Sequence, residues 1–139
     1  MGRFYRRVRL HGHGSDRILA TKKFGAPSSN NAGIYIFGGI YKIDILVDGK
    51  CIGQSAPNGF IYIEVEGGKV HRLSIDSGLA PNNLDLSFES GKNYFVRQYV
   101  TTGDTVGGAG LEVIPEQQAK ADIAILDLAK TGNCSATQK

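Results

Sequence analysis

The chain has 139 residues, of which 41% are hydrophobic and 21% charged, with 19 glycines, four prolines and no tryptophan. This length and composition accommodate one ordinary globular domain and argue against a repeat array or a two-domain enzyme. The net charge of +3 is unevenly spread: the first 23 positions hold seven basic residues and one acid, and the rest holds nine basic residues and twelve acids. Only the head of the chain is therefore basic, which makes nucleic acid an unlikely partner of the domain itself.

Residues 1–31 are expected to form a basic arm followed by a linker. The run 11–15, His-Gly-His-Gly-Ser, resembles an added tag as much as native sequence, and both origins stay open. Residues 25–31 have a composition that favours a loop. Arginines alternate with aromatic residues in the arm, a composition that neutralises phosphates and stacks on bases. The arginines are Arg3, Arg6, Arg7 and Arg9, beside Phe4 and Tyr5.

Beyond the linker, hydrophobic residues recur with a period of two, which predicts short strands. Asp48-Gly49 predicts a two-residue hairpin turn, and Gly67-Gly68 predicts a second hairpin between the strands that flank it. About seven strands follow one another, at 34–37, 41–47, 50–54, 60–66, 69–75, 84–88 and 92–101, and 111–114 can add a last short one.

The period changes at Pro115, where a proline and an acid mark the start of a helix predicted over residues 115–130. Apolar residues repeat at helical spacing in this stretch, so the helix has one side to bury. We therefore predict a mainly β domain over 32–131, an antiparallel β-sandwich or open barrel with one C-terminal α-helix, followed by a polar tail at 132–139.

Strict alternation places aromatic residues on the side of the sheet that faces away from the predicted core. If Ile61, Ile63 and Val65 face the core, Phe60 and Tyr62 do not. If Tyr94, Val96 and Val100 face it, Phe95, Arg97 and Tyr99 point away. Two interpretations stay open: the C-terminal helix covers this face with Ile123 and Leu126, or the face binds a partner. The candidate partner-binding residues are Phe60, Tyr62, Phe95, Arg97 and Tyr99.

No group of residues in the sequence has the spacing of a catalytic, cofactor or metal site. His11 and His13 form an i, i+2 pair in the glycine-rich arm, too few ligands to predict a metal site. His71 is the only histidine of the predicted domain and would be the base of a small hydrolase, if the protein were one. Cys51 and Cys134 stand 83 positions apart, and the sequence leaves open whether they pair.

The sequence also lacks the apolar runs that mark a membrane-spanning helix or an export signal. No apolar run reaches the about 18 residues of a membrane-spanning helix. The basic opening is not followed by the apolar stretch of a secretory signal. Taken alone, the sequence predicts a cytoplasmic chain.

Several stretches together resemble an uncharacterised bacterial family of exported proteins and lipoproteins, domain of unknown function 2846. They are Lys23-Phe24 with Ala26-Pro27, 32–37, 47–50, 91–97, 111–113 and 116–121, so the resemblance covers about residues 23–130. It implies a sandwich-like β fold and a periplasmic or outer-membrane-associated setting, and no activity. Two features depart from the family pattern: a lipoprotein signal is absent, and Gly38-Gly39 stands where members commonly carry an arginine.

Our leading hypothesis is a non-catalytic binding or scaffold module of the bacterial cell envelope, with a protein or envelope component as partner and no cofactor. Pairing of exposed sheet edges between copies would make it a homo-oligomer. The alternatives are a cytosolic nucleic-acid-associated protein that uses the basic arm, and a small hydrolase that uses His71.

Overall fold

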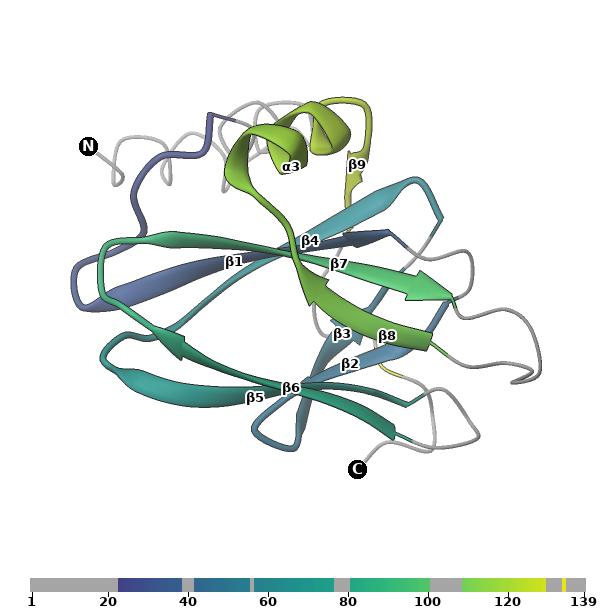
Figure 1. Cartoon of the computed structure of the whole chain (residues 1–139), viewed down its shortest axis with the longest axis horizontal. Coiled ribbons are helices and arrows are strands. Elements are labelled where there is room, and N and C mark those ends of the chain that lie inside the picture. Colours follow the sequence, from purple (N-terminus) through teal and green to yellow (C-terminus); the bar gives the residue numbers. More distant parts are fainter. Residues whose placement is uncertain are drawn as a thin grey trace.

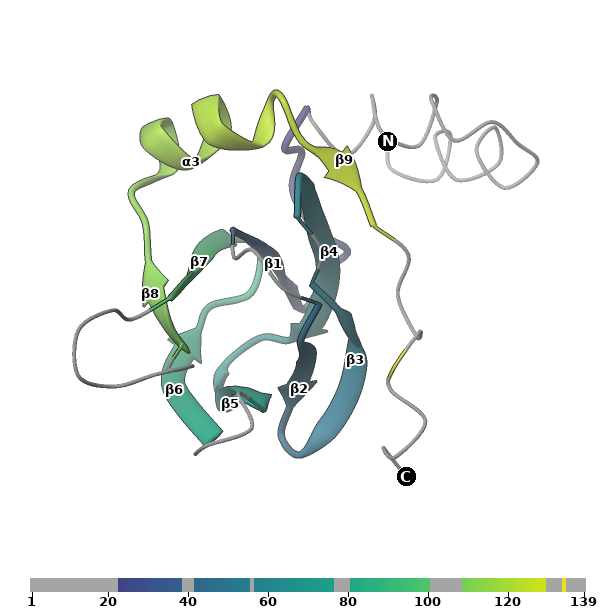
Figure 2. The same ribbon diagram turned by 90° about the vertical axis from the view of Figure 1, so that its right-hand side faces the viewer.

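The computed structural model is a β-sandwich of two sheets with one short helix (Figure 1). The structure describes residues 23–38, 42–55, 57–76, 81–100, 109–129 and 134. The two sheets face each other, and the helix lies on the outer side of one of them (Figure 2). The predicted fold class is confirmed as a sandwich rather than a barrel.

The larger sheet, called sheet A here, has the strand order β8-β7-β1-β4-β9, and the smaller sheet B has the order β3-β2-β5-β6. Strands β1 and β7 run parallel, as do β4 and β9, and the other neighbours are antiparallel. The strands are β1 (Asn31–Gly38), β2 (Asp44–Val47), β3 (Lys50–Gln54), β4 (Gly59–Glu66), β5 (Lys69–Asp76), β6 (Pro81–Phe88), β7 (Asn93–Val100), β8 (Ala109–Val113) and β9 (Asp127–Leu128).

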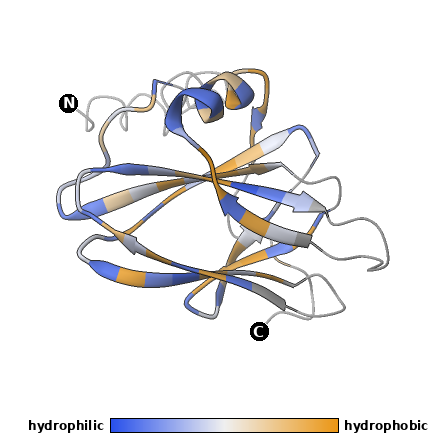
Figure 3. Cartoon of the chain, viewed as in Figure 1, coloured by the Kyte–Doolittle hydropathy of each residue, from blue (hydrophilic) through white to orange (hydrophobic). Residues whose placement is uncertain are grey.

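The main core lies between the sheets and is built by the alternation along each strand. Hydrophobic and hydrophilic residues alternate along the strands in Figure 3. Ile34 and Ile36 of β1 point inward and are fully or almost fully buried. The inward positions predicted for β4 and β7 are confirmed, because Ile61, Ile63, Val65, Tyr94 and Val96 all pack in this core.

The hairpin predicted at Asp48-Gly49 is confirmed. Both residues have positive φ, 51° and 87°, as a two-residue turn with the twist of an antiparallel pair requires. β2 and β3 pair on either side of the turn.

The second predicted hairpin, at Gly67-Gly68, is wrong. The strands before and after this turn lie in different sheets, so the turn carries the chain from sheet A to sheet B. The chain returns from β6 to β7 through Ser90, and the two crossings touch: a Cβ at Gly67 would lie 2.6 Å from the Ser90 backbone. Glycine is needed here for close approach, and turn chemistry alone does not tell a hairpin from a crossing between sheets.

The helix α3 (Glu116–Ile123) is shorter than the predicted 115–130. The chain leaves the helix because it pairs with the edge of β4: the Asp127 amide donates to the Asn58 carbonyl, and the Ala129 amide donates to the Phe60 carbonyl. An extended backbone is required for these bonds. The apolar spacing of residues 124–130 fits a helix as well as a strand that packs on the same layer, so spacing could not separate the two.

Gln98 places a polar side chain in the interior of the fold. It lies on β7 and is 1% exposed, and neither its Nε2 nor its Oε1 has a hydrogen-bond partner among the described residues. We expect Gln98→Met, which keeps the shape and removes the polar atoms, to raise the free energy of unfolding by about 1–3 kcal/mol. Urea denaturation measures this change. A loss of stability in Gln98→Met would contradict the unpaired state, and Gln98→Glu, which buries a charge, should be destabilised.

Candidate functional site

An aromatic layer occupies the outer face of sheet A. Its centre is Tyr35 of β1, whose ring lies 5.0 Å from that of Phe95, 4.7 Å from that of Tyr62 and 6.3 Å from that of Phe60. α3 covers the layer with Ala119 and Ile123, both fully buried. The layer is thus a second hydrophobic core, outside the sandwich. Figure 2 shows the place of α3 on the outer side of sheet A.

This arrangement decides between the two interpretations of the outer aromatic residues. Phe60 and Phe95 are 1% and 3% exposed, so the expectation that they lie on an exposed face is wrong for these two residues. Ile123 and Leu126 pack on the layer, which confirms that the C-terminal helix and the turn after it cover this face. The physical reason is the large apolar surface area of aromatic side chains. Burying that area beneath a neighbouring element stabilises the fold.

The segment before β1 also belongs to this layer. The ring of Phe24 lies 5.0 Å from that of Tyr35 and 5.9 Å from that of Phe95, and Lys120 Nζ of α3 stands 5.3 Å from its centre. The Asn93 amide group donates to the carbonyls of Phe24 and Gly25. Residues 23–30 hold no helix or strand, as predicted for a linker, but Phe24 packs on the aromatic layer.

Tyr62 is half-buried and serves a structural hydrogen-bond network. Glu64 accepts hydrogen bonds from the Tyr62 hydroxyl at 2.9 Å, the Asn31 amide group at 3.0 Å and the Ser28 backbone amide at 3.2 Å. Burial opposes the charged carboxylate, but these bonds outweigh it and lower the pKa of Glu64. Burial, followed by the charge of Glu64, raises the pKa of Tyr62, so its hydroxyl stays a donor. These hydrogen bonds hold the segment before β1 against β4.

Two of the predicted residues remain accessible on β7, Arg97 and Tyr99, and they lie beside Gly110 and Glu112 of β8, which the sequence did not single out. Tyr99 is 39% exposed, and its side chain lies against Gly110, with Cζ 2.4 Å from where a Cβ would stand there. Arg97 and Glu112 form an ion pair beside it, with Arg97 Nε donating to Glu112 Oε2 at 2.9 Å and Arg97 Nη2 to the same oxygen. We call Arg97, Tyr99, Gly110 and Glu112 the β7–β8 strip.

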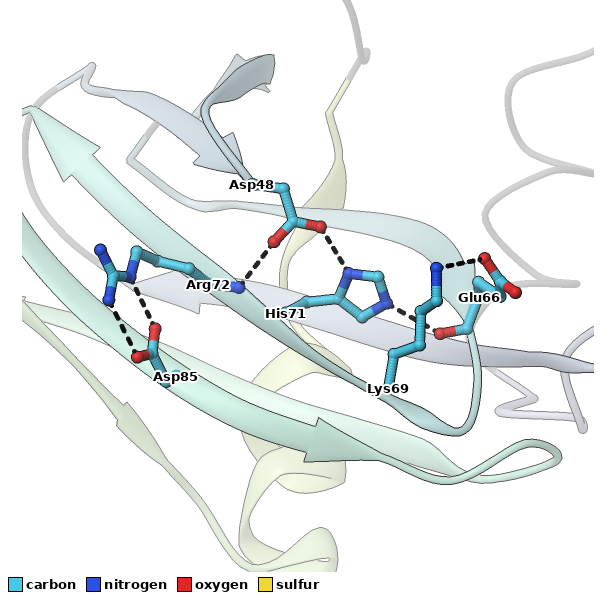
Figure 4. Close-up of polar contacts among 6 residues, drawn as sticks. All are labelled: Asp48, Glu66, Lys69, His71, Arg72 and Asp85. Atoms are coloured by element: carbon cyan, nitrogen blue, oxygen red, sulfur yellow. Dashed lines mark hydrogen bonds and ion pairs between the residues drawn. The ribbon is translucent and has the colours of Figure 1, made fainter.

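A polar cluster stands where the hairpin turn of sheet B meets the end of β4 (Figure 4). His71 Nδ1 lies 2.6 Å from Asp48 Oδ2, and His71 Nε2 lies 2.8 Å from the Glu66 carbonyl oxygen. Asp48 Oδ1 also accepts from the Arg72 backbone amide at 2.9 Å. Around this pair, Arg72 binds Asp85 through two nitrogens and Lys69 binds Glu66 at 3.0 Å.

The geometry of His71 does not favour a hydrolase. A general base needs a ring nitrogen with a free lone pair facing the substrate. Each nitrogen of His71 instead faces an acceptor of the protein, a carboxylate and a backbone carbonyl, and the ring is buried. Sequence reasoning missed Asp48, although one signal was present: His71 shares its inward positions with Leu73 and Ile75, where a polar ring requires a partner.

A disulfide joins Cys51 and Cys134, with Cα atoms 6.3 Å apart. Cys51 belongs to β3, the edge strand of sheet B, whereas β9 just before the tail pairs with sheet A. The C-terminal segment therefore links the edges of both sheets. Cys134, which was assigned to a polar tail at 132–139, is covalently part of the fold.

The remaining predictions concern regions that the structure does not describe. Arg3, Arg6, Arg7 and Arg9, with His11 and His13, lie outside the described residues, so a nucleic-acid role for the arm stays a prediction. Within the described residues no cluster of three or more His, Cys, Asp or Glu could hold a metal ion. No helix in this part of the chain is long and apolar enough to cross a membrane.

Two comparisons with known proteins give a family but no activity. A family model described as "Protein of unknown function (DUF2846)" matches residues 28–110. An uncharacterized protein of Haemophilus influenzae is 41% identical over 113 residues, covering 78% of this chain and 67% of the relative. The family model begins just before β1 and ends in β8, so it covers most of the β-sandwich.

Proposed function

Since the chain belongs to the DUF2846 family, of unknown function, we propose from its own geometry that it is a non-catalytic binding or scaffold module of the bacterial cell envelope. The observation that carries this proposal is the disulfide between Cys51 and Cys134. Disulfides form and persist in oxidising compartments such as the periplasm and are rare in the cytosol. A structural disulfide thus supports an extracytoplasmic setting.

Binding rather than catalysis is supported by what the polar side chains do. His71, Glu64 and Asp48 are engaged by protein partners that fix the fold, which leaves them unsuited to act on a substrate. The β7–β8 strip offers a different chemistry, an exposed tyrosine beside an arginine and a glutamate. Tyrosine and arginine are the residue types that most often dominate binding at protein interfaces. We assign the contact surface to this strip.

Site-specific photocrosslinking tests the proposal in the bacterium that carries the protein. A photoreactive amino acid at position 99 is expected to give a discrete adduct of higher mass, because this position would lie inside the interface. The same residue at position 87 is the matched control, since Ser87 is exposed on the outer face of sheet B, away from the strip. Absence of an adduct at position 99, or the same adduct at both positions, would overturn the assignment of the strip.

A further inference from the structure

We infer that His71 is a proton-operated latch, which fastens the β2–β3 turn of sheet B to the end of β4 in sheet A when its ring is doubly protonated and releases it when the ring is neutral. This inference is independent of the proposed function, because it depends only on the contacts of the polar cluster in Figure 4.

The two contacts of the ring favour the doubly protonated state. Asp48 Oδ2 and the Glu66 carbonyl oxygen are both acceptors, at 2.6 and 2.8 Å from the ring nitrogens. A neutral imidazole has one N–H, so it can donate to only one of them and turns a lone pair toward the other. The imidazolium donates to both. The geometry is therefore complementary to the charged ring.

The latch adds a side-chain connection between two parts of the fold that each meet β5 through the backbone. Asp48 stands in the turn and is fixed on one side by β5, because its backbone amide donates to the Arg72 carbonyl at 2.8 Å and its Oδ1 accepts from the Arg72 amide. Glu66 ends β4 in the other sheet. The His71 ring spans the two, so losing one N–H removes the side-chain connection between Asp48 and Glu66 and leaves the chain crossing at Gly67-Gly68 in place.

The charges around the ring leave Asp48 as its counter-ion. From β5, Lys69 opposes the charged ring, but Lys69 is itself paired with the Glu66 carboxylate. The Arg72 guanidinium is held by Asp85 of β6 on the exposed side. β6 presents the apolar ring of Phe88 to His71 at 5.7 Å, and Phe88 is backed by Tyr94 of β7. Glu89 and Lys92, near the crossing, pair with each other.

The pH range of the closed latch follows from both partners. Burial of His71 disfavours the charged ring, but the hydrogen bonds to Asp48 and to the Glu66 carbonyl outweigh it and raise the pKa of His71. The hydrogen bonds from the Arg72 amide and from His71 lower the pKa of Asp48. The latch is thus fully closed below the ordinary histidine pKa of about 6.5 and opens as pH rises through the raised value of His71. At the acid end it opens only when pH falls through the lowered value of Asp48.

NMR titration of the histidine side chains in the wild-type protein is the first test, and it needs no altered protein beyond a His71→Gln spectrum for assignment. His71 is expected to titrate above about 6.5, with both ring nitrogens protonated at pH 6. A titration midpoint below that value, or nitrogen shifts of a neutral ring at pH 6, would overturn the inference.

Hydrogen exchange at the Arg72 amide tests the mechanical consequence. As pH rises through the titration of His71, the protection factor of the Arg72 amide is expected to fall by about tenfold, because one charge-assisted hydrogen bond is lost. The protection factor is corrected for intrinsic exchange. His71→Gln should abolish this step. Asp85→Asn, which breaks the exposed pair with Arg72 and leaves the latch intact, should retain it. A step that survives in His71→Gln, or is absent in the wild type, would contradict the latch.

Discussion

Replacing Ile123 by alanine is expected to lower the free energy of unfolding by about 2–5 kcal/mol, the range for a buried isoleucine that leaves a cavity. Ile123 is 0% exposed and anchors α3 on the aromatic layer. The same substitution at Ile125, which is 84% exposed, should change stability by no more than about 0.5 kcal/mol. Denaturant unfolding of both variants measures the difference.

The pair of variants isolates packing, because the residue type and the chain region are the same. Equal effects at both positions would contradict the burial of the aromatic layer beneath α3. Loss of α3 contacts should also expose Phe60 and Phe95 to solvent, which an increase in binding of a hydrophobic dye to Ile123→Ala would report.

Removing the disulfide is the second large effect, an expected loss of about 2–4 kcal/mol. The bridge spans 83 positions of sequence, so it restricts the unfolded chain strongly, and it also holds the C-terminal segment on β3. The double variant Cys51→Ser with Cys134→Ser should unfold at lower denaturant concentration than the oxidised wild type. Thermal and urea unfolding measure the shift.

Reductant supplies the control for this prediction. It should shift the wild type toward the double variant and leave the double variant unchanged, since that protein has no thiol to respond. A reductant effect of equal size on both proteins, or none on the wild type, would show that the bridge does not form in solution.

Local patterns predicted the sandwich, because period-two alternation reports which side of a strand is buried. The inward residues Ile61 and Val96 and the turn at Asp48-Gly49 were found in this way. The predicted hairpin at Gly67-Gly68 and the predicted helix end at residue 130 are wrong for one reason. Which strands pair depends on strands far away in the sequence. Gly67-Gly68 suits a hairpin, yet β4 pairs with β1 and β5 with β2 and β6.

The site was harder to predict for the same reason. The face shared by Phe60, Phe95 and Tyr99 followed from alternation, but its division into a covered and an accessible part depends on where α3 ends. The partners of His71 lie 23 and 5 positions away. The inward position of His71 indicates that its ring needs a partner, but nothing in the sequence shows that Asp48 and a backbone carbonyl are those partners. The same holds for the ring of Phe24 on Tyr35.

Thiol trapping in the cells that carry the protein tests the proposed envelope setting most directly. Cells are quenched with acid, and free thiols are alkylated with a mass-tagged reagent under denaturing conditions. We predict that the chain gains no tag unless it is first reduced, and that it then gains two, because Cys51 and Cys134 are bonded to each other. A chain that gains two tags without reduction would have both thiols free in the cell, which would contradict an oxidising compartment and with it the proposed function.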